Sequence, residues 1–387
     1  MPTETSERLG ALPAGEFQRR LDEWIADNAA LLREYEPDES RSVEEATAFP
    51  RRYQNLLYDA GWLRAGWPAE IGGTGGSAER RAQVYESLGA AGYATPETLP
   101  TLEVLIPALL SYAPELAVRF VPAFLRGDEL WCQGFSETEA GSDMAAMRTR
   151  AARDGDEWVI NGHKVWNSYA SVSDRCILLA RTGAQSDRHR GISAFLVDMD
   201  TPGVEARPIT TMTGRNELSE IYFEDARVPA DRLIGEQNQG WAFAMFMMQY
   251  ERGMYAWMRQ AWCLHQLEML RPYITDTRFE RDFGAAFGRV TALRLVARRT
   301  LRRLAEGEFV GPEVSIDKLL LSSTEQAVLN LARDVLRGRF ELDDSPEMRR
   351  WRGDYFYTRS SSIYGGAAEI QRDIVAQRVL GLPRARG

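Results

Sequence analysis

Two neighbouring stretches, Phe135-Ser-Glu-Thr-Glu-Ala-Gly-Ser-Asp143 and Asp154-Gly-Asp-Glu-Trp-Val-Ile-Asn-Gly-His-Lys-Val-Trp166, carry the strongest signal in this chain. The first is a loop rich in hydroxyl groups and glycine, which can turn backbone N–H groups toward a planar or anionic ligand. The second alternates in hydrophobicity, and its Asn161-Gly162 dipeptide favours a type I′ turn, so we expect a hairpin that brings Trp166 to the loop. Together they predict the wall of a cofactor site.

Composition indicates a globular enzyme with two or three domains. The 387 residues are 44% hydrophobic and 27% charged, which is ordinary for a chain that buries a sizeable core. A net charge of -9 argues against nucleic acid or an anionic membrane as a partner. No window approaches the roughly 18 uninterrupted apolar residues of a membrane span, and the first residues carry no apolar leader core. We therefore expect a cytoplasmic protein.

The cysteines and histidines predict neither a metal site nor a disulfide framework. Cys132, Cys176 and Cys263 have no CxxC spacing, and only three histidines are present. Zinc sites and disulfide scaffolds need closer or more numerous ligands. This usage fits a reducing compartment.

Periodicity divides the chain into helices, a β unit and helices again. Apolar residues from Phe17 to Leu32 recur at helical spacing, with further helical patterns over 42–60, 78–88 and 102–125, so residues 1–130 are expected to form an N-terminal helical domain. Period-two patterns at 158–165, 176–180, 192–197, 204–209 and 221–223 predict a small β-barrel or sandwich domain over 131–230. Helical patterns at 241–270, 278–305, 314–337 and 360–379 predict a C-terminal four-helix bundle over 231–387. The expected fold class is α+β.

The order of short motifs resembles the acyl-CoA dehydrogenase family of FAD-dependent enzymes. Each motif alone is weakly specific, but the order in which the motifs follow one another is strongly specific. The matching residues span nearly the whole chain: Gly61-Trp62, Trp67-Pro68, Gly72-Gly73, the Ser136-to-Asp143 loop, Asn161-Gly162-x-Lys164-x-Trp166, Arg181-Thr182, Val228-Pro229, Gly235-x-x-x-x-Gly240-Trp241, Glu251-Arg252, Ile370-Gln371-Arg372 and Arg378 to Pro383.

This resemblance implies a flavin site built on the loop and strand quoted above. Phe135 and Ser136 would contact the pyrimidine end of the flavin, and Trp166 and Ser168 its dimethylbenzene side and N5. Further cofactor-binding residues would be Gly141, Ser142, Tyr364 and Glu369. Taken without the resemblance, Gly141 and Ser142 could form an ordinary turn, and Trp166 could fill a core.

The implied chemistry is α,β-dehydrogenation of an acyl thioester, in which a base removes the α proton while a hydride leaves the β carbon for flavin N5. Such a proton is weakly acidic, so hydrogen-bond donors must stabilise the enolate-like charge. A buried carboxylate suits the base, since loss of water raises its pKa.

The position of that carboxylate departs from the commonest family pattern. Most members place a glutamate after the tyrosine of the last helical region, where this chain has Tyr364-Gly365-Gly366. A minority carries the base in an earlier Glu-Arg pair, which Glu251-Arg252 matches. Glu251 also shares a helical face with Met247, Met254 and Met258, a costly place for an unused charge. The alternative is an ion pair that pins the helix.

Arg252, Gly365, Gly366 and Ser142 are the predicted substrate-binding residues. The resemblance suggests that Arg252 holds the segment bearing Tyr364 and Gly365; otherwise it is a solvated surface arginine. The paired glycines could leave room for a branched, aromatic or polycyclic acyl group, or they could simply make a loop.

Two departures leave the ADP part of FAD without assigned residues. Glu280 stands three positions before Phe283-Gly284 where the family usually has arginine, and residues 344–355 contain no Gly-Gly pair. In the tail, Ala367 replaces the usual threonine.

The resemblance also implies partners. These are acyl-CoA or an acyl-carrier thioester, an electron-transfer flavoprotein, and either a homo-oligomer (dimer or tetramer) or a heterotetramer with a related chain. Alternative functions are a non-catalytic, partner-dependent subunit of a heteromeric acyl-CoA dehydrogenase, or an oxidase or monooxygenase on the same fold.

Overall fold

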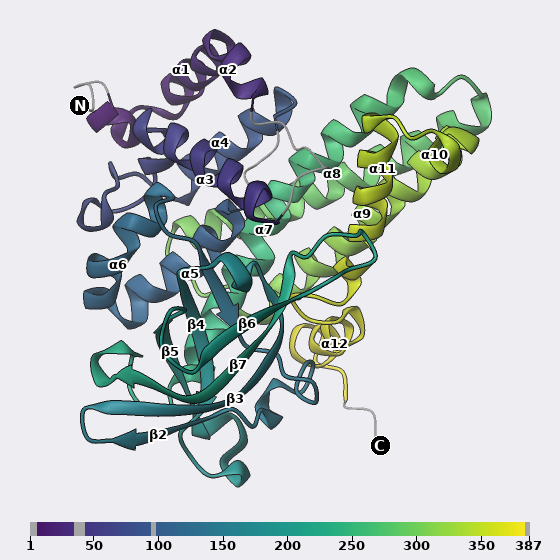
Figure 1. Ribbon diagram of the computed structural model, residues 1–387. Helices are drawn as coiled ribbons and strands as arrows, with labels where there is room; N and C mark the ends of the chain where they lie inside the picture. Colours follow the sequence, from purple (N-terminus) through teal and green to yellow (C-terminus); the bar gives the residue numbers. More distant parts are fainter. Residues whose placement is uncertain (1–5, 35–42, 94–97, 384–387) are drawn as a thin grey trace.

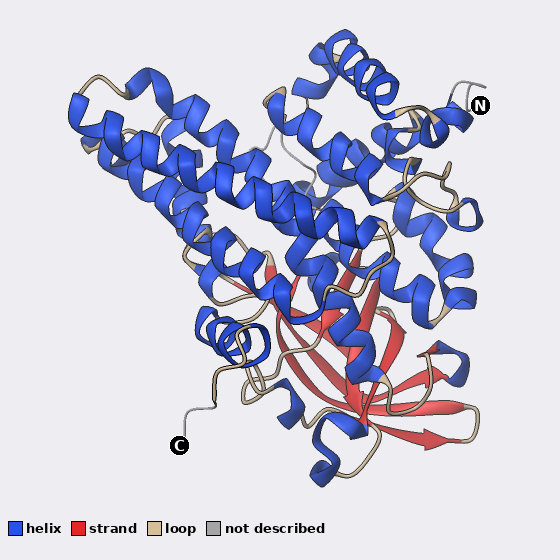
Figure 2. Cartoon of the chain, turned by 180° about the vertical axis from the view of Figure 1, so that it is seen from behind, coloured by secondary structure: helices blue, strands red, loops and turns tan. Residues whose placement is uncertain are grey.

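The computed structural model describes residues 6–34, 43–93 and 98–383. Two groups of helices flank a sheet, and the long C-terminal helices extend away from it (Figures 1 and 2). This is the expected α+β architecture. In the described ranges, no helix combines the length and apolarity needed to cross a membrane.

The N-terminal helices follow the predicted periodicity but are divided at two points. Asn28 separates the first apolar stripe into two helices, and its side-chain amide donates to Trp24 O at 2.8 Å. Ala113-Pro114 separates the last two. Pro50 lies inside a helix. The bounds are α1 Ala14–Asp27, α2 Ala29–Arg33, α3 Val43–Asp59, α4 Ala78–Ala90, α5 Leu99–Tyr112 and α6 Pro114–Arg126.

The β unit is one eight-stranded sheet with the order β6-β7-β3-β2-β4-β5-β8, and β1 pairs with β4. Trp158 of β3 meets Phe195 of β5 with ring centroids 5.3 Å apart, although two strands separate them. The sheet therefore curls over its own core, as a small barrel or sandwich must. The strands are β1 Trp131–Gly134, β2 Arg150–Asp154, β3 Glu157–Ser168, β4 Arg175–Arg181, β5 Ile192–Asp198, β6 Val204–Ile209, β7 Leu218–Pro229 and β8 Leu233–Ile234.

The prediction that Asn161-Gly162 forms the hairpin turn is wrong. Both residues lie inside β3, and the turn between β2 and β3 is at Gly155 and Asp156. A Cβ on Gly162 would lie 2.4 Å from Thr149 Oγ1, and the register against β7 shifts between Ile160 and Gly162. The dipeptide thus marks a bulge with close backbone approach. The continued strand still carries Trp166 to the loop.

The C-terminal helices are α7 Gly240–Leu270, α8 Thr277–Ala305, α9 Val314–Leu336, α10 Gly338–Leu342, α11 Pro346–Tyr357 and α12 Ala368–Ile374. Helices α7, α8 and α9 pack together, and α11 and α12 pack on α9. The predicted single helix over 360–379 is wrong, because Gly365 and Gly366 have φ values of 62° and 101° and interrupt it with a turn. Helices α10 and α11 were not predicted.

Strands β4 and β5 are buried on both faces. Ile177 and Leu179 belong to the core shared with the helices, whereas Leu178 and Ala180 belong to the core inside the curled sheet. Central strands covered on both sides carry continuous apolar runs. They join the helical part of the molecule to the β unit.

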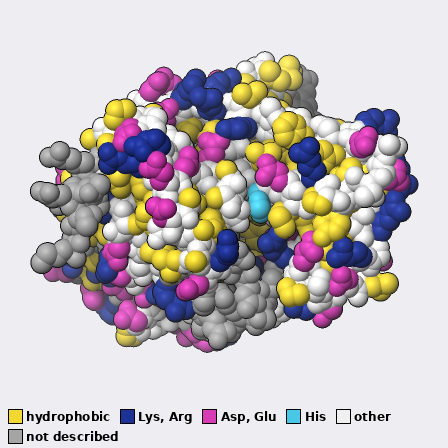
Figure 3. Space-filling model, turned by 90° about the horizontal axis from the view of Figure 1, so that it is seen from above, with side chains coloured by type: hydrophobic (Ala, Val, Ile, Leu, Met, Phe, Trp, Pro, Cys, Tyr) yellow, Lys and Arg dark blue, Asp and Glu magenta, His cyan; other side chains and the backbone are white. Residues whose placement is uncertain are grey.

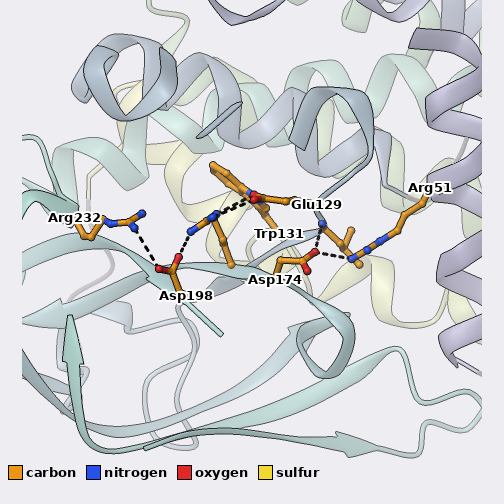
Figure 4. A network of polar contacts seen from close by, with 8 residues as sticks. Arg51, Glu129, Trp131, Asp174, Asp198 and Arg232 are labelled. Carbon is orange, nitrogen blue, oxygen red and sulfur yellow. Dashed lines mark hydrogen bonds and ion pairs between the residues drawn. The ribbon is translucent and has the colours of Figure 1, made fainter. Parts of the chain in front are cut away.

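An arginine–carboxylate network closes the edge of this junction (Figure 4). Arg51 of α3 donates to Asp174 at 2.7 Å. Arg175 of β4 pairs with Glu129 at 2.9 Å and also with Asp198. The network links the first helices to β4 and β5. On the face seen in Figure 3, basic, acidic and hydrophobic side chains are interspersed.

A second ion pair is buried between α4 and α5. Arg81 Nε lies 2.9 Å from both carboxylate oxygens of Glu103, and its guanidinium carbon lies 3.7 Å from the centroid of the Trp67 ring. Tyr85 also donates to Glu103. Because the side chains of Arg81 and Glu103 are only 6% and 1% exposed, each charge depends on its partner.

We expect Arg81→Met to lower the free energy of unfolding by about 3–5 kcal/mol, because it leaves the Glu103 charge buried without its cation. Urea denaturation followed by tryptophan fluorescence measures the change. The double variant Arg81→Met/Glu103→Leu should recover most of the loss. A single variant as stable as the wild-type protein would contradict this account.

Candidate active site

The loop after β1 is held against β3 by a buried lysine. Lys164 is fully buried, and its Nζ donates to Phe135 O at 3.1 Å and to Glu137 Oε1 at 2.8 Å. Val165 N donates to Ser136 O at 3.0 Å. These contacts bring the two quoted stretches together, as the sequence predicts.

Trp166 has the geometry of a ligand-facing residue. Its side chain is 60% exposed, so the alternative that it fills a core is wrong. Its φ of 65° is unusual for a bulky residue and costs about 1–3 kcal/mol. Strain combined with an exposed indole ring is typical of functional sites.

The remaining predicted wall residues lie on the loop after β1 and on β3. Gly141 and Ser142 are exposed, and Ser168, also exposed, is the last residue of β3. A Cβ on Gly141 would meet nothing within 4 Å, so the loop leaves open space there. Phe135 is buried and presents its carbonyl to Lys164. The loop thus carries an exposed hydroxyl group at Ser142, and β3 carries another at Ser168 together with the exposed Trp166 indole.

Helix α7 begins directly against the sheet. A Cβ on Gly240 would lie 2.5 Å from the backbone of Ser193 in β5, so only glycine allows this approach. Further along α7, Met247, Met254 and Met258 are buried, as their spacing with Glu251 predicts. Glu251 itself is half-buried. Burial raises the pKa of its carboxyl, and the charges of Arg252 and Lys318 oppose that shift.

The carboxylate of Glu251 lies beside the turn at Gly365. A Cβ on Gly365 would be 3.1 Å from Glu251 Oε1, so the carboxylate occupies the place next to the position where most of the family carries its glutamate. Arg252 Nε donates to Gly365 O at 3.2 Å. The expectation that Arg252 packs on this turn is therefore confirmed.

The space beside both glycines is filled by protein. A Cβ on Gly366 would lie 2.2 Å from Gln371 Nε2, just as one on Gly365 meets Glu251. The glycines therefore admit Glu251 and Gln371 to the turn. Room for a large acyl group would have to come from elsewhere in the site.

Of the other predicted residues, Tyr364 lies at the Gly365 turn, whereas Glu369 lies on the exposed side of α12. The ring of Tyr364 is covered by Lys318 Nζ at 3.9 Å, beside the Gly365 turn. Glu369 is on α12, 80% exposed, and 3.7 Å from Arg372. In the described part of the chain, no group of three or more His, Cys, Asp or Glu side chains is arranged to hold a metal ion.

Two buried charged residues of α9 were not predicted from the sequence. Lys318 of α9 is 3% exposed, and Glu325 is fully buried and pairs with Arg259 of α7. Their spacing of seven places Lys318 and Glu325 on one face of α9. The available signal was that the chain contains only two lysines, Lys164 and Lys318.

A cavity of about 530 Å³ lies at the arginine network of Figure 4. Glu129, Asp174, Arg175, Asp198 and Asp200 are among its lining residues. Arg175 pairs with Glu129 and Asp198, and Asp174 pairs with Arg51. The cavity belongs to the junction of helices and sheet, and none of the predicted site residues lines it.

Comparison with known proteins identifies the family. Residues 22–128, 132–226 and 238–380 match the N-terminal, middle and C-terminal domains of acyl-CoA dehydrogenase. The acyl-CoA dehydrogenase IpdE1 of Mycobacterium tuberculosis is 38% identical over 386 residues, covering 95% of this chain and 98% of that protein. The chain therefore belongs to the acyl-CoA dehydrogenase family, whose members are typically flavoproteins. It is an oxidoreductase that acts on the CH–CH group of acyl-CoA.

Two solved structures are also similar over almost their whole length. The Tcur3481-Tcur3483 steroid ACAD aligns with a TM-score of 0.83 and 26% identity, covering 97% of this chain and 99% of that one. The ChsE4-ChsE5 complex from Mycobacterium tuberculosis aligns with a TM-score of 0.79 and 27% identity, covering 99% of both chains.

We expect Gly365→Ala to cost more stability than Gly307→Ala. Both glycines have positive φ, at 62° and 78°, so each alanine carries about 1–2 kcal/mol of backbone strain. A Cβ at Gly307 meets nothing within 4 Å, whereas one at Gly365 meets Glu251. Thermal unfolding of both variants measures the difference. Equal losses would show that the Glu251 contact has no energetic weight.

Proposed function

We propose that the protein catalyses FAD-dependent α,β-dehydrogenation of an acyl-CoA with Glu251 as the base. The observation that carries the proposal is the Glu251 carboxylate, held 3.1 Å from the Cβ position of Gly365. It supplies the carboxyl group that the Tyr364-Gly365-Gly366 turn lacks.

The loop and strand fit the flavin that family members carry. The exposed, strained Trp166 gives a flat apolar surface, and Ser136 and Ser142 on the loop and Ser168 on β3 supply hydrogen-bonding groups. We propose that these residues, with Phe135 and Gly141, hold the isoalloxazine ring, and that Tyr364 and Glu369 add contacts to the cofactor. When bound, FAD would accept the hydride that leaves the β carbon.

The surroundings of Glu251 suit proton abstraction. Burial raises the pKa of its carboxyl, which makes the ionised form a stronger base than an exposed glutamate. Arg252 and Lys318 oppose this shift and favour the ionised form of the carboxylate. Because α7 is packed along its apolar face, Glu251 is held on a rigid helix rather than on a loop.

We propose a bulky cyclic acyl group as the substrate. Its support is the similarity to a structure described as a steroid ACAD. Arg252, Gly365, Gly366 and Ser142 would surround the thioester end. Because Glu251 and Gln371 fill the space at the glycines, the ring system would extend away from the turn.

We propose that the protein works in an oligomer, either of identical chains or with a related chain, and that an electron-transfer flavoprotein reoxidises it. One similar structure is a complex of two named chains. In this chain the apolar side chains of Ile363, Leu380 and Leu382, all in the C-terminal segment, are 68%, 64% and 53% exposed, and a second chain would cover such side chains.

We expect Glu251→Gln to keep the yellow flavin and to lower the rate of anaerobic flavin reduction by acyl-CoA by about 10²- to 10⁴-fold, as loss of a general base does. Stopped-flow absorbance measures the rate. Glu268→Gln removes an exposed carboxylate from the same helix and should leave the rate unchanged. Full activity in Glu251→Gln would refute the assignment.

We expect polycyclic acyl-CoA thioesters to perturb the oxidised flavin spectrum at lower concentration than straight-chain thioesters of similar carbon number. The reason is that preformed contact with a rigid ring system loses less conformational entropy than ordering a flexible chain. Difference spectra against a panel of both kinds measure this. Tighter binding of the straight chains would contradict the proposed substrate class.

A further inference from the structure

The two lysines of this chain occupy unusual places. Of the 47 lysine and arginine residues, only Lys164 and Lys318 are lysine, and both are buried. Lys164 holds the cofactor loop. Lysine and arginine differ because an ammonium is compact and loses its proton in an accessible pH range, whereas a guanidinium stays charged. A buried lysine at position 318, in a chain whose other cations are almost all arginine, therefore suggests a specific role.

Lys318 joins three parts of the candidate active site. Its Nζ donates to Ser361 O at 2.7 Å and lies 3.9 Å from the centroid of the Tyr364 ring. The Cβ position of Gly365 is 3.6 Å from Lys318 Nζ and 3.1 Å from Glu251 Oε1. The ammonium and the carboxylate thus approach the same point from opposite helices, α9 and α7.

We infer that Lys318 is a positioning residue, which fixes the Ser361-to-Gly365 turn by its hydrogen bond and sets the proton affinity of Glu251 by its charge. This inference rests on the proposed function of Glu251 as the base. No predicted site residue has this role, and Arg252 acts on the turn from the other side, through Gly365 O.

Several charged groups act on the protonation of Lys318 and Glu251. Burial lowers the pKa of Lys318 to about 8, while Glu325 and Glu251 act to raise it and Arg252 and Arg259 to lower it. Glu325 is already paired with Arg259. Tyr364 contributes its ring, and Tyr255 packs beside that ring with centroids 6.3 Å apart. Glu325 and Glu251 are therefore the two carboxylates whose charges act on the Lys318 ammonium, and Glu251 is the one that lies against the Gly365 turn.

The sign of the coupling follows from these charges. A cation beside Glu251 favours the ionised form, so its removal raises the pKa of Glu251. Activity that needs ionised Glu251 is then lost at a higher pH as the solution is acidified. An opposite charge within about 4–6 Å shifts a pKa by about 1–3 units.

The first test is the pH profile of anaerobic flavin reduction in the holoenzyme. Lys318→Met should move the acid limb upward by about one pH unit, whereas Lys318→Arg should leave that limb in place and abolish any loss of activity near pH 8. Arg333→Met removes an exposed cation from the same helix and should shift nothing. A Lys318→Met enzyme with a lower rate but an unshifted limb would overturn the inference.

The second test needs no variant at Lys318. With lysine labelled by ¹³C at the ε carbon, the chain has two lysine signals, and the one that titrates near pH 8 reports Lys318. In Glu251→Gln its midpoint should fall, because coupling between two groups is reciprocal. An unchanged midpoint would overturn the inference even if Glu251→Gln is inactive. Conversely, an active Glu251→Gln enzyme with a lowered midpoint would refute the proposed function alone.

Discussion

The structure of the candidate active site depends on one half-buried carboxylate and the way its charge is balanced. Glu251 projects from the apolar face of α7 toward the Gly365 turn, with Arg252 and Lys318 as the nearby cations that oppose the rise in its pKa. A carboxylate without such partners would be protonated or would destabilise the helix. The same cations also bond the turn, Arg252 at Gly365 O and Lys318 at Ser361 O. The same two side chains therefore oppose the rise in the pKa of Glu251 and fix the geometry of the turn.

The sheet fixes this arrangement relative to the cofactor wall. Strands β4 and β5 are buried on both faces, and α7 begins in contact with β5 because Gly240 has no side chain. The loop after β1 is joined to β3, the strand that carries Trp166, by Lys164 and by the Val165–Ser136 hydrogen bond. Both halves of the site are thus anchored to the same rigid unit, which is what precise placement of a base against a cofactor requires.

The fold class, most helices and strands β3 to β7 follow from hydrophobic periodicity, whereas β1, β2, β8 and the order of the strands in the sheet were not predicted. Local signals failed where tertiary contact overrode them. The Asn161-Gly162 dipeptide predicts a turn, yet Gly162 lies inside β3, where Thr149 packs so closely against it that no side chain would fit. The turn at Gly365 could be predicted only from its glycines. The role of Lys318 could not be predicted from periodicity, because it depends on contacts with distant parts of the chain. Glu251 lies 67 positions earlier, and the Ser361-to-Gly365 turn lies over 40 positions later.

The placement of the carboxylate on α7 has a physical consequence for the turn. A glutamate at position 365 would need a side chain at a backbone φ of 62°, where residues other than glycine are strained. With the carboxyl group supplied by a helix, glycine at this position relieves that strain and leaves a site for Glu251 Oε1. The carboxylate then lies on the face of α7 that carries three buried methionines, where an unpaired charge is unfavourable. Arg252 and Lys318 favour the ionised carboxylate there, so the place of Glu251 on α7 depends on these two cations.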